Sequence, residues 1–402
     1  MVRVLFVHPD LGIGGAERLV IDAALALKKK GHEVSFITAH HDPNHCFPET
    51  VDGSLDVVCV GDWLPRSTFG IFYALWAYIR MLYISLYLVL FTKLDYEVIF
   101  VDQISICIPV LRFKKTAKIL FYCHYPDQLL TDRKSIMKKF YRFFLDKMEE
   151  ITTRNADVIL VNSKFTAGVF KNTFKSITIS PSILHPSLDF TKFDNTKCDS
   201  ESDVKEIVFL SLNRYERKKN VSLAIKAFYS LLENLQTFHE VNLKLIIAGG
   251  YDPRVCENIE YFSELVSLAE NLGIEEKIEF LKSPSDEAKI SLILKSTCLI
   301  YTPSNEHFGI VPIESMYLGT PVLAVNSGGP TETVLDGITG FLRDPNAEDF
   351  AAVLKEFVDG SVSKSSMSKA CRNHVISKFS FDNFASRLHY IVQGLIDGRK
   401  QK

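Results

Sequence analysis

Residues 298–325 read CLIYTPSNEHFGIVPIESMYLGTPVLAV, with apolar runs at 298–301 and 321–325 on either side of a helical stretch. Continuous apolar runs of this length, bounded by turn residues, are typical of parallel strands that are buried on both faces. Parallel neighbours need a helical crossover, which the residues between the two runs supply. This stretch therefore predicts a parallel α/β sheet with helices on both faces.

The same alternation of strand and helix occurs twice along the chain. The second half has three more apolar runs before the quoted stretch, at 206–212, 243–248 and 277–281. The first half has a helical pattern at 16–30 and six runs, at 3–7, 33–38, 56–60, 97–101, 118–123 and 157–161. Because 402 residues are also long for one hydrophobic core, we expect two α/β domains.

A change of texture separates the two halves. Residues 181–189, PSILHPSLD, carry two prolines and are followed by the polar stretch 195–205. Such a change is typical of a linker, so it predicts one domain at 1–187 and a second at 188–380. Residues 381–402 begin with an amphipathic helix at 381–397, and the sequence does not indicate on which domain it packs.

The composition is that of an ordinary globular protein. Hydrophobic residues make up 47% and charged residues 23%, and a net charge of −2 gives no general attraction to nucleic acid. The eight cysteines contain no CxxC pair, which is the usage of a reducing compartment. The opening residues, MVRVLFVHPD, fit a buried strand better than a signal peptide, because His8, Pro9 and Asp10 end the apolar run.

Residues 71–91, IFYALWAYIRMLYISLYLVLF, interrupt the globular pattern. They are long enough to span a bilayer, but Arg80 lies near their centre and seven of the 21 residues are aromatic. Aromatic residues are enriched at the membrane interface. We favour a helix that lies in one leaflet; a buried helix of the first domain and a true span are the alternatives.

Residues 133–147, RKSIMKKFYRFFLDK, are a second candidate for contact with lipid. They predict a basic amphipathic helix with Ile136, Phe140, Phe143 and Phe144 on one side. An ordinary helix with a solvated face explains the same pattern equally well.

Residues 8–19, HPDLGIGGAERL, follow the first strand and open the first helix. A turn built from Gly14 and Gly15 lets the backbone approach a ligand closely and aims free amides at an anion, whereas the alternative is a tight turn without a ligand. A dinucleotide fingerprint is excluded, because Glu17 replaces its third glycine and the end of the second strand, at 37–40, carries no acid for a ribose.

Residues 212–220, LNRYERKKN, follow the first strand of the second half. Arg214 and Lys219 are thereby expected at the mouth of a parallel sheet, just before a helix, where two cations form a clamp for a diphosphate. A run of charges is usually just a solvated turn. The position of this run directly after a strand favours the clamp instead. The glycosylation sequon Asn220-Val-Ser222 overlaps this clamp, so we expect it never to meet the lumenal machinery.

The most specific stretch for function is 303–314, PSNEHFGIVPIE, which places two glutamates eight residues apart around a Phe-Gly turn. If a helix begins near Gly309, the amides of Phe308, Gly309 and Ile310 point at a bound phosphate. Glu314, about one turn into that helix, is then placed to accept hydrogen bonds from a ribose. Glu306, which precedes the helix, reaches the transferred sugar.

His124, in the stretch CHYPD at the end of a first-domain strand, is a candidate to hydrogen-bond a sugar, and a structural role is the equal alternative. The chain contains no Asp-x-Asp, the carboxylate pair typical of metal-bound sugar nucleotides. The stretch HHDPNHC at 40–46 matches no standard zinc spacing and contains a proline, so we interpret it as a polar loop. The sequence thus predicts no metal site.

Together these motifs resemble family 4 retaining glycosyltransferases, which have the GT-B fold of two Rossmann-like domains facing a central cleft. The resemblance is carried by Arg214 with Lys219, by Glu306-x7-Glu314, and by the GTPVLAVNSGGPTE stretch that follows. Within that family, the stretches HPDLGIGGAERLVIDAALAL, YCHYPDQLL, LNRYERKKN and EHFGIVPIESMYLGTPVLA closely resemble the dolichol-pathway α-1,3/1,6-mannosyltransferases of the endoplasmic reticulum.

The resemblance implies a substrate pair and a compartment. It implies GDP-mannose as donor and Man-GlcNAc2-pyrophosphoryl-dolichol as acceptor, with an α-1,3 and then an α-1,6 mannose added during early assembly of the N-glycan precursor. It places the enzyme on the cytosolic face of the endoplasmic reticulum membrane, without a metal cofactor and without nucleic acid. Other early dolichol-pathway transferases are its candidate partners.

The resemblance also implies roles for individual residues. Arg214 and Lys219 neutralise the leaving diphosphate, Glu306 sits beside the mannose and Glu314 beside the ribose. His124 approaches the sugar from the first, acceptor-side domain, where Gly14 and Gly15 keep the loop slim. The amides of Phe308, Gly309 and Ile310 hold the donor.

Two other functions are compatible with the same residues. One is another family 4 glycosyltransferase with a lipid acceptor, such as one that transfers N-acetylglucosamine from its UDP derivative to phosphatidylinositol. The motifs for diphosphate binding do not distinguish the two nucleotide bases. The other is an inactive scaffold, which is disfavoured because both cations and both glutamates are present.

Overall fold

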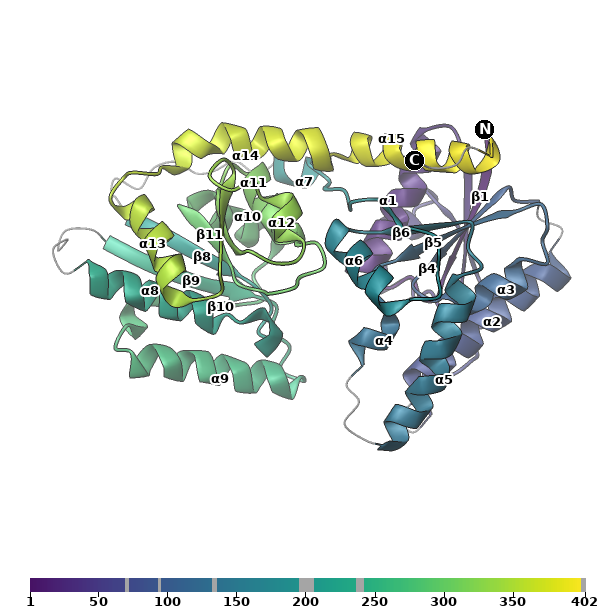
Figure 1. Cartoon of the computed structure of the whole chain (residues 1–402), viewed down its shortest axis with the longest axis horizontal. Coiled ribbons are helices and arrows are strands. Elements are labelled where there is room, and N and C mark those ends of the chain that lie inside the picture. Colours follow the sequence, from purple (N-terminus) through teal and green to yellow (C-terminus); the bar gives the residue numbers. More distant parts are fainter. Residues whose placement is uncertain (69–71, 93–94, 132–135, 195–205, 236–241, 399–402) are drawn as a thin grey trace. The chain divides into compact units, whose positions relative to one another are not determined.

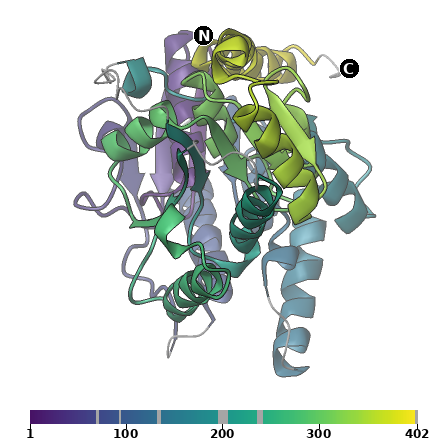
Figure 2. The same cartoon turned by 90° about the vertical axis from the view of Figure 1, so that its left-hand side faces the viewer.

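The computed structural model describes residues 1–68, 72–92, 95–131, 136–194, 206–235 and 242–398. Contacts divide the chain into two compact units (Figure 1). Unit 1 comprises Met1–Ser187 together with Phe381–Lys402, and unit 2 comprises Leu188–Ser380. Each unit is a parallel sheet with helices on both faces (Figures 1 and 2), which confirms the predicted Rossmann-like architecture.

The sheet of unit 1 is parallel throughout the described residues, in the order β3-β2-β1-β4-β5-β6-β7. On β1, Phe6 stacks between Phe36 on β2 and Phe100 on β4, with ring centroids 4.9 and 4.7 Å apart. Six strands match the predicted runs, whereas the short β7 lies inside the stretch predicted as a linker. The strands are β1 (Arg3–His8), β2 (Glu33–Thr38), β3 (Asp56–Cys59), β4 (Val98–Asp102), β5 (Lys118–Cys123), β6 (Val158–Val161) and β7 (Ser182–Ile183).

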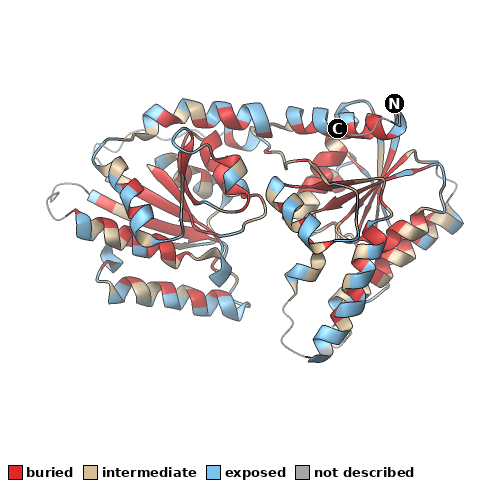
Figure 3. Cartoon of the chain, in the orientation of Figure 1, coloured by how far each residue is buried: buried red, intermediate tan, exposed pale blue. Residues whose placement is uncertain are grey.

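The helices of unit 1 cover two separate hydrophobic cores, one on each face of the sheet. The first core contains residues of α1 and α15, and the second contains residues of α2, α3, α5 and α6. Figure 3 shows this burial along the strands and the inner helix faces. The helices are α1 (Gly15–Lys29), α2 (Tyr73–Phe91), α3 (Ile108–Leu111), α4 (Asp127–Leu130), α5 (Ile136–Thr153), α6 (Lys164–Thr173) and α15 (Phe381–Ile396), with 3-10 turns at Pro48–Thr50 and Ser105–Cys107.

The C-terminal helix α15 packs on unit 1, which answers the question that the sequence leaves open. It lies against α1, and Leu388 and Val392 are fully buried there. At its start Asp382 forms an ion pair of 2.7 Å with Lys29. The polypeptide therefore leaves unit 1, forms unit 2 and returns to complete the first core.

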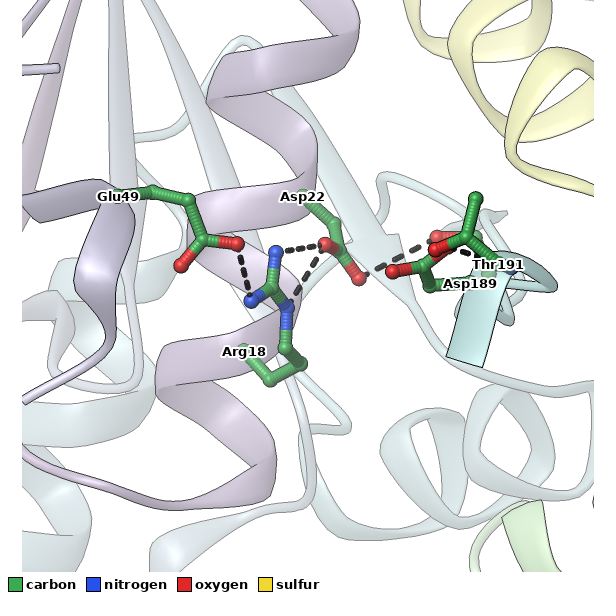
Figure 4. A network of polar contacts seen from close by, with 6 residues as sticks. Arg18, Asp22, Glu49, Asp189 and Thr191 are labelled. Atoms are coloured by element: carbon green, nitrogen blue, oxygen red, sulfur yellow. Dashed lines mark hydrogen bonds and ion pairs between the residues drawn. The ribbon is translucent and has the colours of Figure 1, made fainter. Parts of the chain in front are cut away.

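Helix α1 is fixed by a partly buried charge cluster (Figure 4). The guanidinium of Arg18 contacts Asp22 on the next turn and donates to Glu49 at 2.8 Å. Asp22 also accepts a hydrogen bond from Ser187 at 3.4 Å. In unit 2, Asp189 accepts hydrogen bonds from the amide and hydroxyl of Thr191, the first residue of α7.

Helix α2 corresponds to the apolar segment 71–91, of which residue 71 lies outside the described residues. Among the described helices it is the one long and apolar enough to cross a membrane. One face nevertheless packs in the second core of unit 1, where Met81 and Ile84 are fully buried. The opposite face leaves Leu86 and Leu90 exposed.

The sheet of unit 2 has the described order β10-β9-β8-β11-β12-β13 and is also parallel. Five strands match the predicted runs, and β13 is additional: β8 (Glu206–Leu212), β9 (Asn242–Gly249), β10 (Ile278–Lys282), β11 (Cys298–Tyr301), β12 (Val322–Val325) and β13 (Gly340–Arg343). Its helices are α7 (Thr191–Asp194), α8 (Ser222–Asn234), α9 (Cys256–Asn271), α10 (Asp286–Lys295), α11 (Ile310–Tyr317), α12 (Pro330–Thr333), α13 (Ala347–Val358) and α14 (Lys364–Phe379), with 3-10 turns at Arg217–Lys219 and Glu275–Lys277.

Candidate active site

Lys219 lies in the loop between β8 and α8, at the carboxyl edge of the unit 2 sheet. It ends the 3-10 turn Arg217–Lys219, and Asn220 follows with a positive φ of 46°. The carbonyl of Lys219 accepts a hydrogen bond of 2.7 Å from the hydroxyl of Thr302, directly after β11. Two neighbouring strand ends therefore fix the backbone that carries this lysine.

The ammonium group of Lys219 forms an ion pair with the carboxylate of Glu306. Both side chains are largely buried. Burial opposes ionisation of Glu306, but the charge and hydrogen bond of Lys219 outweigh it, so the pKa of Glu306 lies below its ordinary value. The structure therefore brings together two of the predicted site residues, as a charged pair near neutral pH.

Arg214 lies at the same edge of the sheet but is differently placed. Its side chain is 60% exposed and pairs with Glu216 at 2.9 Å. Burial raises the pKa of the Tyr301 hydroxyl well above its ordinary value; the charge of Glu306 raises it further, and Arg214 acts in the opposite direction. Arg214 and Glu306 thus both act on Tyr301, at the end of β11.

The loop that carries Glu306 rests on two glycines after β12. The amide of Gly329 donates to the carbonyl of Glu306 at 2.7 Å, and the amide of Asn305 donates to the hydroxyl of Ser327 at 2.8 Å. A Cβ atom on Gly328 would lie 2.4 Å from the Glu306 carbonyl oxygen, and one on Gly329 would lie 2.2 Å from that of Phe308. Only glycine fits at these two positions.

Helix α11 begins at Ile310, close to the predicted start. Gly309 is its N-cap, with a positive φ of 83°, and no side chain caps this helix among the described residues. The first amides of a helix have no intrahelical acceptor, so this end is suited to an anion. The ring of Phe308 is buried beside Phe379, with centroids 5.8 Å apart, which fixes the turn before the helix.

Glu314 is the fifth residue of α11 and is buried. Its Oε1 accepts a hydrogen bond of 3.1 Å from Lys289 on α10, whereas its buried Oε2 has no partner among the described residues. Burial raises the pKa of Glu314, and the charge of Lys289 offsets part of that rise. A buried carboxylate oxygen without a donor is costly, so it favours a bound hydroxyl group at this position.

In unit 1, His124 follows β5 and its Nε2 lies 2.9 Å from Oδ1 of Asp102, the last residue of β4. The other oxygen of Asp102 lies 3.0 Å from Nδ1 of His8, the last residue of β1. Nε2 of His8 lies 3.7 Å from Glu17 on α1. We call His8, Glu17, Asp102 and His124 the histidine cluster.

Gly14 and Gly15 are the N-cap and the first residue of α1. A Cβ atom on Gly14 would lie 2.2 Å from the carboxylate of Glu17, whereas one on Gly15 would have nothing within 4 Å. The structure thus gives Gly14 a steric role, and it leaves open space beside Gly15.

The segment 40–46, which we interpreted as a polar loop, makes local contacts. His40 pairs with Asp62, and His41 lies 2.9 Å from the hydroxyl of Thr50. Within the part of the chain that the structure describes, no three His, Cys, Asp or Glu side chains are grouped as metal ligands.

Several residues of these sites were not predicted. Lys289 lies within a helical pattern with no signal for binding. His8 and Asp102 have the same signal as His124, since each is a polar residue at the end of a strand. Ser327 to Gly329 belong to the stretch GTPVLAVNSGGPTE, which carries part of the family resemblance, but no individual role was predicted for them.

Family models match both halves of the chain. Residues 13–182 match Glycosyltransferase Family 4, and residues 192–374 match Glycosyl transferases group 1. The human Alpha-1,3/1,6-mannosyltransferase ALG2 is 48% identical over 401 residues, which cover 98% of this chain and 96% of the human protein. The chain belongs to the ALG2 mannosyltransferase family. ALG2 of Rhizomucor pusillus is 47% identical over 97% of this chain and 91% of that protein, and ALG2 of Saccharomyces cerevisiae is 42% identical over 84% and 72%.

Solved structures with a similar fold include a glycosyltransferase and a sucrose-phosphate synthase. A glycosyltransferase from Rickettsia africae has a TM-score of 0.73 at 20% identity and covers 98% of both chains. Sucrose-phosphate synthase from Thermosynechococcus elongatus has a TM-score of 0.72 at 19% identity and covers 99% of this chain and all of the other. These likenesses confirm the predicted GT-B fold of this mannosyltransferase, and its family confirms that it is an enzyme.

Proposed function

We propose that this mannosyltransferase uses GDP-mannose to extend a Man-GlcNAc2-pyrophosphoryl lipid acceptor, first with an α-1,3 and then with an α-1,6 mannose. Its family membership supports mannosyl transfer. The observation that carries the donor assignment is the buried pair of Lys219 and Glu306 beside the N-terminus of α11, where a cation and free amides converge at one sheet edge. Such an edge is where parallel α/β sheets bind their ligands.

In this proposal Lys219 exchanges partners when the donor binds. Its ammonium group contacts the diphosphate, and the amides of Gly309 and Ile310 contribute the partial positive charge of the helix end. Arg214, whose side chain is exposed, swings from Glu216 onto the same diphosphate. Negative charge that develops as the sugar leaves is thereby stabilised by protein groups, and the reaction needs no metal cofactor.

Two glutamates then hold the rest of the donor. Glu306, released from part of its contact with Lys219, is available to the hydroxyl groups of the mannose. The unpartnered Oε2 of Glu314 accepts from the ribose, while Oε1 remains bound to Lys289. His124 and the loop at Gly14 and Gly15 contribute to the acceptor side in unit 1.

The test is mannose transfer to a synthetic lipid-linked acceptor with GDP-mannose and a metal chelator. Lys219→Ala should reduce kcat/KM by ~10²–10³-fold, because a preorganised donor to the leaving group is lost. Lys218→Ala is the matched control: this neighbouring lysine is exposed and contacts Glu216, so its loss should leave turnover unchanged.

Three results would contradict the proposal. Normal turnover by Lys219→Ala would contradict the role of Lys219 in binding the diphosphate. Loss of wild-type turnover when the chelator is added would contradict a metal-free mechanism. Transfer from UDP-N-acetylglucosamine to phosphatidylinositol, with no reaction of GDP-mannose, would favour the alternative transferase instead.

The proposal includes attachment to the cytosolic face of the endoplasmic reticulum membrane, and α5 supports it. Ile136 is 84% and Phe140 is 68% exposed, and further apolar side chains on the same helix are exposed. We define the aromatic face of α5 by these exposed residues: Ile136, Phe140, Phe143, Phe144 and Met148. The predicted segment 133–147 begins outside the described residues, and α5 continues to Thr153.

Two charged side chains of α5, those of Arg142 and Glu149, are buried, contrary to the usual pattern of a surface helix. Arg142 is buried and donates to Asp127 at 2.7 Å, and Glu149 accepts from the amides of Asp127 and Gln128. Since polar contacts hold α5 on its inner side, the aromatic face is left for another partner. Exposed Lys138 and Lys139 on the same helix favour an anionic lipid surface.

Vesicle flotation of the full chain tests this attachment. Phe140→Ser with Phe143→Ser should weaken binding to vesicles of phosphatidylcholine and phosphatidylserine. Ile259→Ser on α9, which replaces an exposed apolar side chain of unit 2, should not. If instead Leu86→Ser with Leu90→Ser on α2 abolishes binding and the α5 variant binds normally, the membrane surface lies on α2.

A further inference from the structure

The histidine cluster joins four polar side chains from different elements of unit 1. His8 ends β1, Asp102 ends β4, His124 follows β5, and Glu17 belongs to α1. His8 and Asp102 are fully buried, whereas His124 is partly exposed. Buried charge of this kind costs stability unless it is paired, so its presence at a ligand-binding sheet edge calls for a functional reason.

Each contact in the cluster fixes the next one. Glu17 folds back over Gly14 and lies near Nε2 of His8, and Nδ1 of His8 lies 3.0 Å from Asp102. The remaining oxygen of Asp102 lies 2.9 Å from Nε2 of His124. The ring of His124 also packs against the ring of Tyr122, with centroids 4.7 Å apart. Its orientation is therefore fixed both by this ring contact and by the contact of Nε2 with Asp102.

The position of the proton on His124 follows from this geometry. Asp102 has a lowered pKa, because contacts with His124 and His8 outweigh its burial, and a carboxylate can only accept hydrogen bonds. Nε2 of His124 must therefore carry a proton in order to donate to Asp102. In the neutral ring Nδ1 then carries a lone pair, which accepts a hydrogen bond from a hydroxyl group.

We propose that Asp102 is a positioning residue for mannosyl transfer, which holds His124 as its Nε2-protonated form so that Nδ1 accepts from a substrate hydroxyl, and that His8 and Glu17 in turn support Asp102. This inference rests on the proposed function, since it assumes that His124 touches the sugar or the acceptor. It adds three residues that act through His124 and do not themselves contact substrate. It also explains Gly14, because a side chain there would displace Glu17 from His8.

The first test observes the proton directly. In the full chain with ¹⁵N-labelled histidine, assigned with His124→Ala and His8→Gln variants, His124 should be protonated at Nε2 and unprotonated at Nδ1 near pH 7.5. The opposite tautomer would overturn the proposal, because Nε2 would have no proton to give to Asp102. This measurement does not depend on the identity of the substrate, so it separates failure of this inference from failure of the proposed function.

The second test is a double-mutant cycle on kcat for mannose transfer. Asp102→Asn should reduce kcat by about 10- to 100-fold with little change in the KM for GDP-mannose. A loss at or below the lower end of the ~10²–10⁴-fold that a positioned acid or base contributes is expected, because Asp102 acts only through His124. Combined with His124→Ala, it should cause no further loss, because both changes remove one function. Additive losses would show that Asp102 acts independently of His124, and would overturn the proposal.

Glu17→Gln provides the same cycle if Asp102→Asn does not fold. Glu17 is less buried than Asp102, so its replacement disturbs the core less. Glu17→Gln should lower kcat in the wild-type background and have no effect in the His124→Ala background. Equal effects in both backgrounds would contradict the role of this residue in supporting His124.

Discussion

At the residue scale, Glu314 makes the clearest prediction. Its buried Oε2 lacks a partner, and Oε1 is held by Lys289, so Glu314→Ala should remove a charged hydrogen bond to the donor ribose. A bond of this kind contributes about 1.5–3 kcal/mol, which corresponds to a KM for GDP-mannose raised by roughly 10- to 150-fold with kcat nearly unchanged. Asp286→Ala, which removes an exposed second contact of Lys289, is the control and should leave KM unchanged.

His8 predicts how stability depends on pH. Burial by itself lowers the pKa of His8, but contacts with Asp102 and Glu17 raise it from 6.5 to about 9. The folded protein therefore keeps a proton that the unfolded chain releases between these values, so this stabilisation is complete below pH 6.5 and is lost as pH rises through 9. Thermal unfolding from pH 6 to 10 should show Tm falling over that window.

The control for this titration is Glu17→Gln. It removes one contact that raises the pKa of His8, so the fall in Tm should begin at the same pH as in the wild type but be smaller and end at lower pH. An identical pH dependence in both proteins would show that another group causes the fall.

The sequence predicts site residues where a motif holds them together, and it fails where only the fold does. Glu306 and Glu314 lie within one short segment, so their spacing can be read directly from the sequence. Lys289 contacts Glu314 from another helix, and Asp102 reaches His8 and His124 through register across three strands. No local pattern contains such contacts, because they arise from the order of strands in the sheet.

At the element scale, the loop between β11 and α11 depends on the two glycines after β12. Gly329→Ala places a Cβ atom 2.2 Å from the carbonyl of Phe308, so the loop that carries Glu306 must move. We expect kcat/KM to fall by about 100-fold, because a displacement on the order of 1 Å is enough for such a loss. Gly394→Ala on α15 is the control: nothing lies within 4 Å, and alanine favours a helix, so activity should persist with stability unchanged or raised.

Strands are predictable from the sequence to the extent that they are continuous apolar runs. β1 and β11 are continuous apolar runs and were found within a residue of their bounds. β7 has two residues, and β13, GFLR, begins with glycine and ends with arginine, so neither has the pattern of a buried strand. Gly340 in β13 instead fits because a Cβ atom there would lie 2.1 Å from the Val322 carbonyl oxygen, which is a tertiary cause.

At the scale of the whole molecule, the chain closes its first unit with its last helix. The amphipathic pattern of 381–397 predicts that one face of this helix is buried. The pattern does not indicate which element covers that face, and only the fold shows that the helix packs on α1. The same limit applies to α2, whose apolar composition suits both a core and a membrane. One face of α2 is in fact part of the core, so apolar content alone is a poor guide to its surroundings.

This closure makes the stability of the first unit depend on the C-terminus. Leu388 is fully buried against the core that contains α1, so Leu388→Ala should cost about 2–5 kcal/mol. Tyr390→Ala, two residues away but exposed, should cost far less. Hydrogen exchange locates the effect: protection should fall in α1 and β1 and remain in β8 and β11, because unit 2 has its own core. A uniform loss of protection in both units would instead mean that they unfold as one, and that the return of the chain stabilises the molecule as a whole.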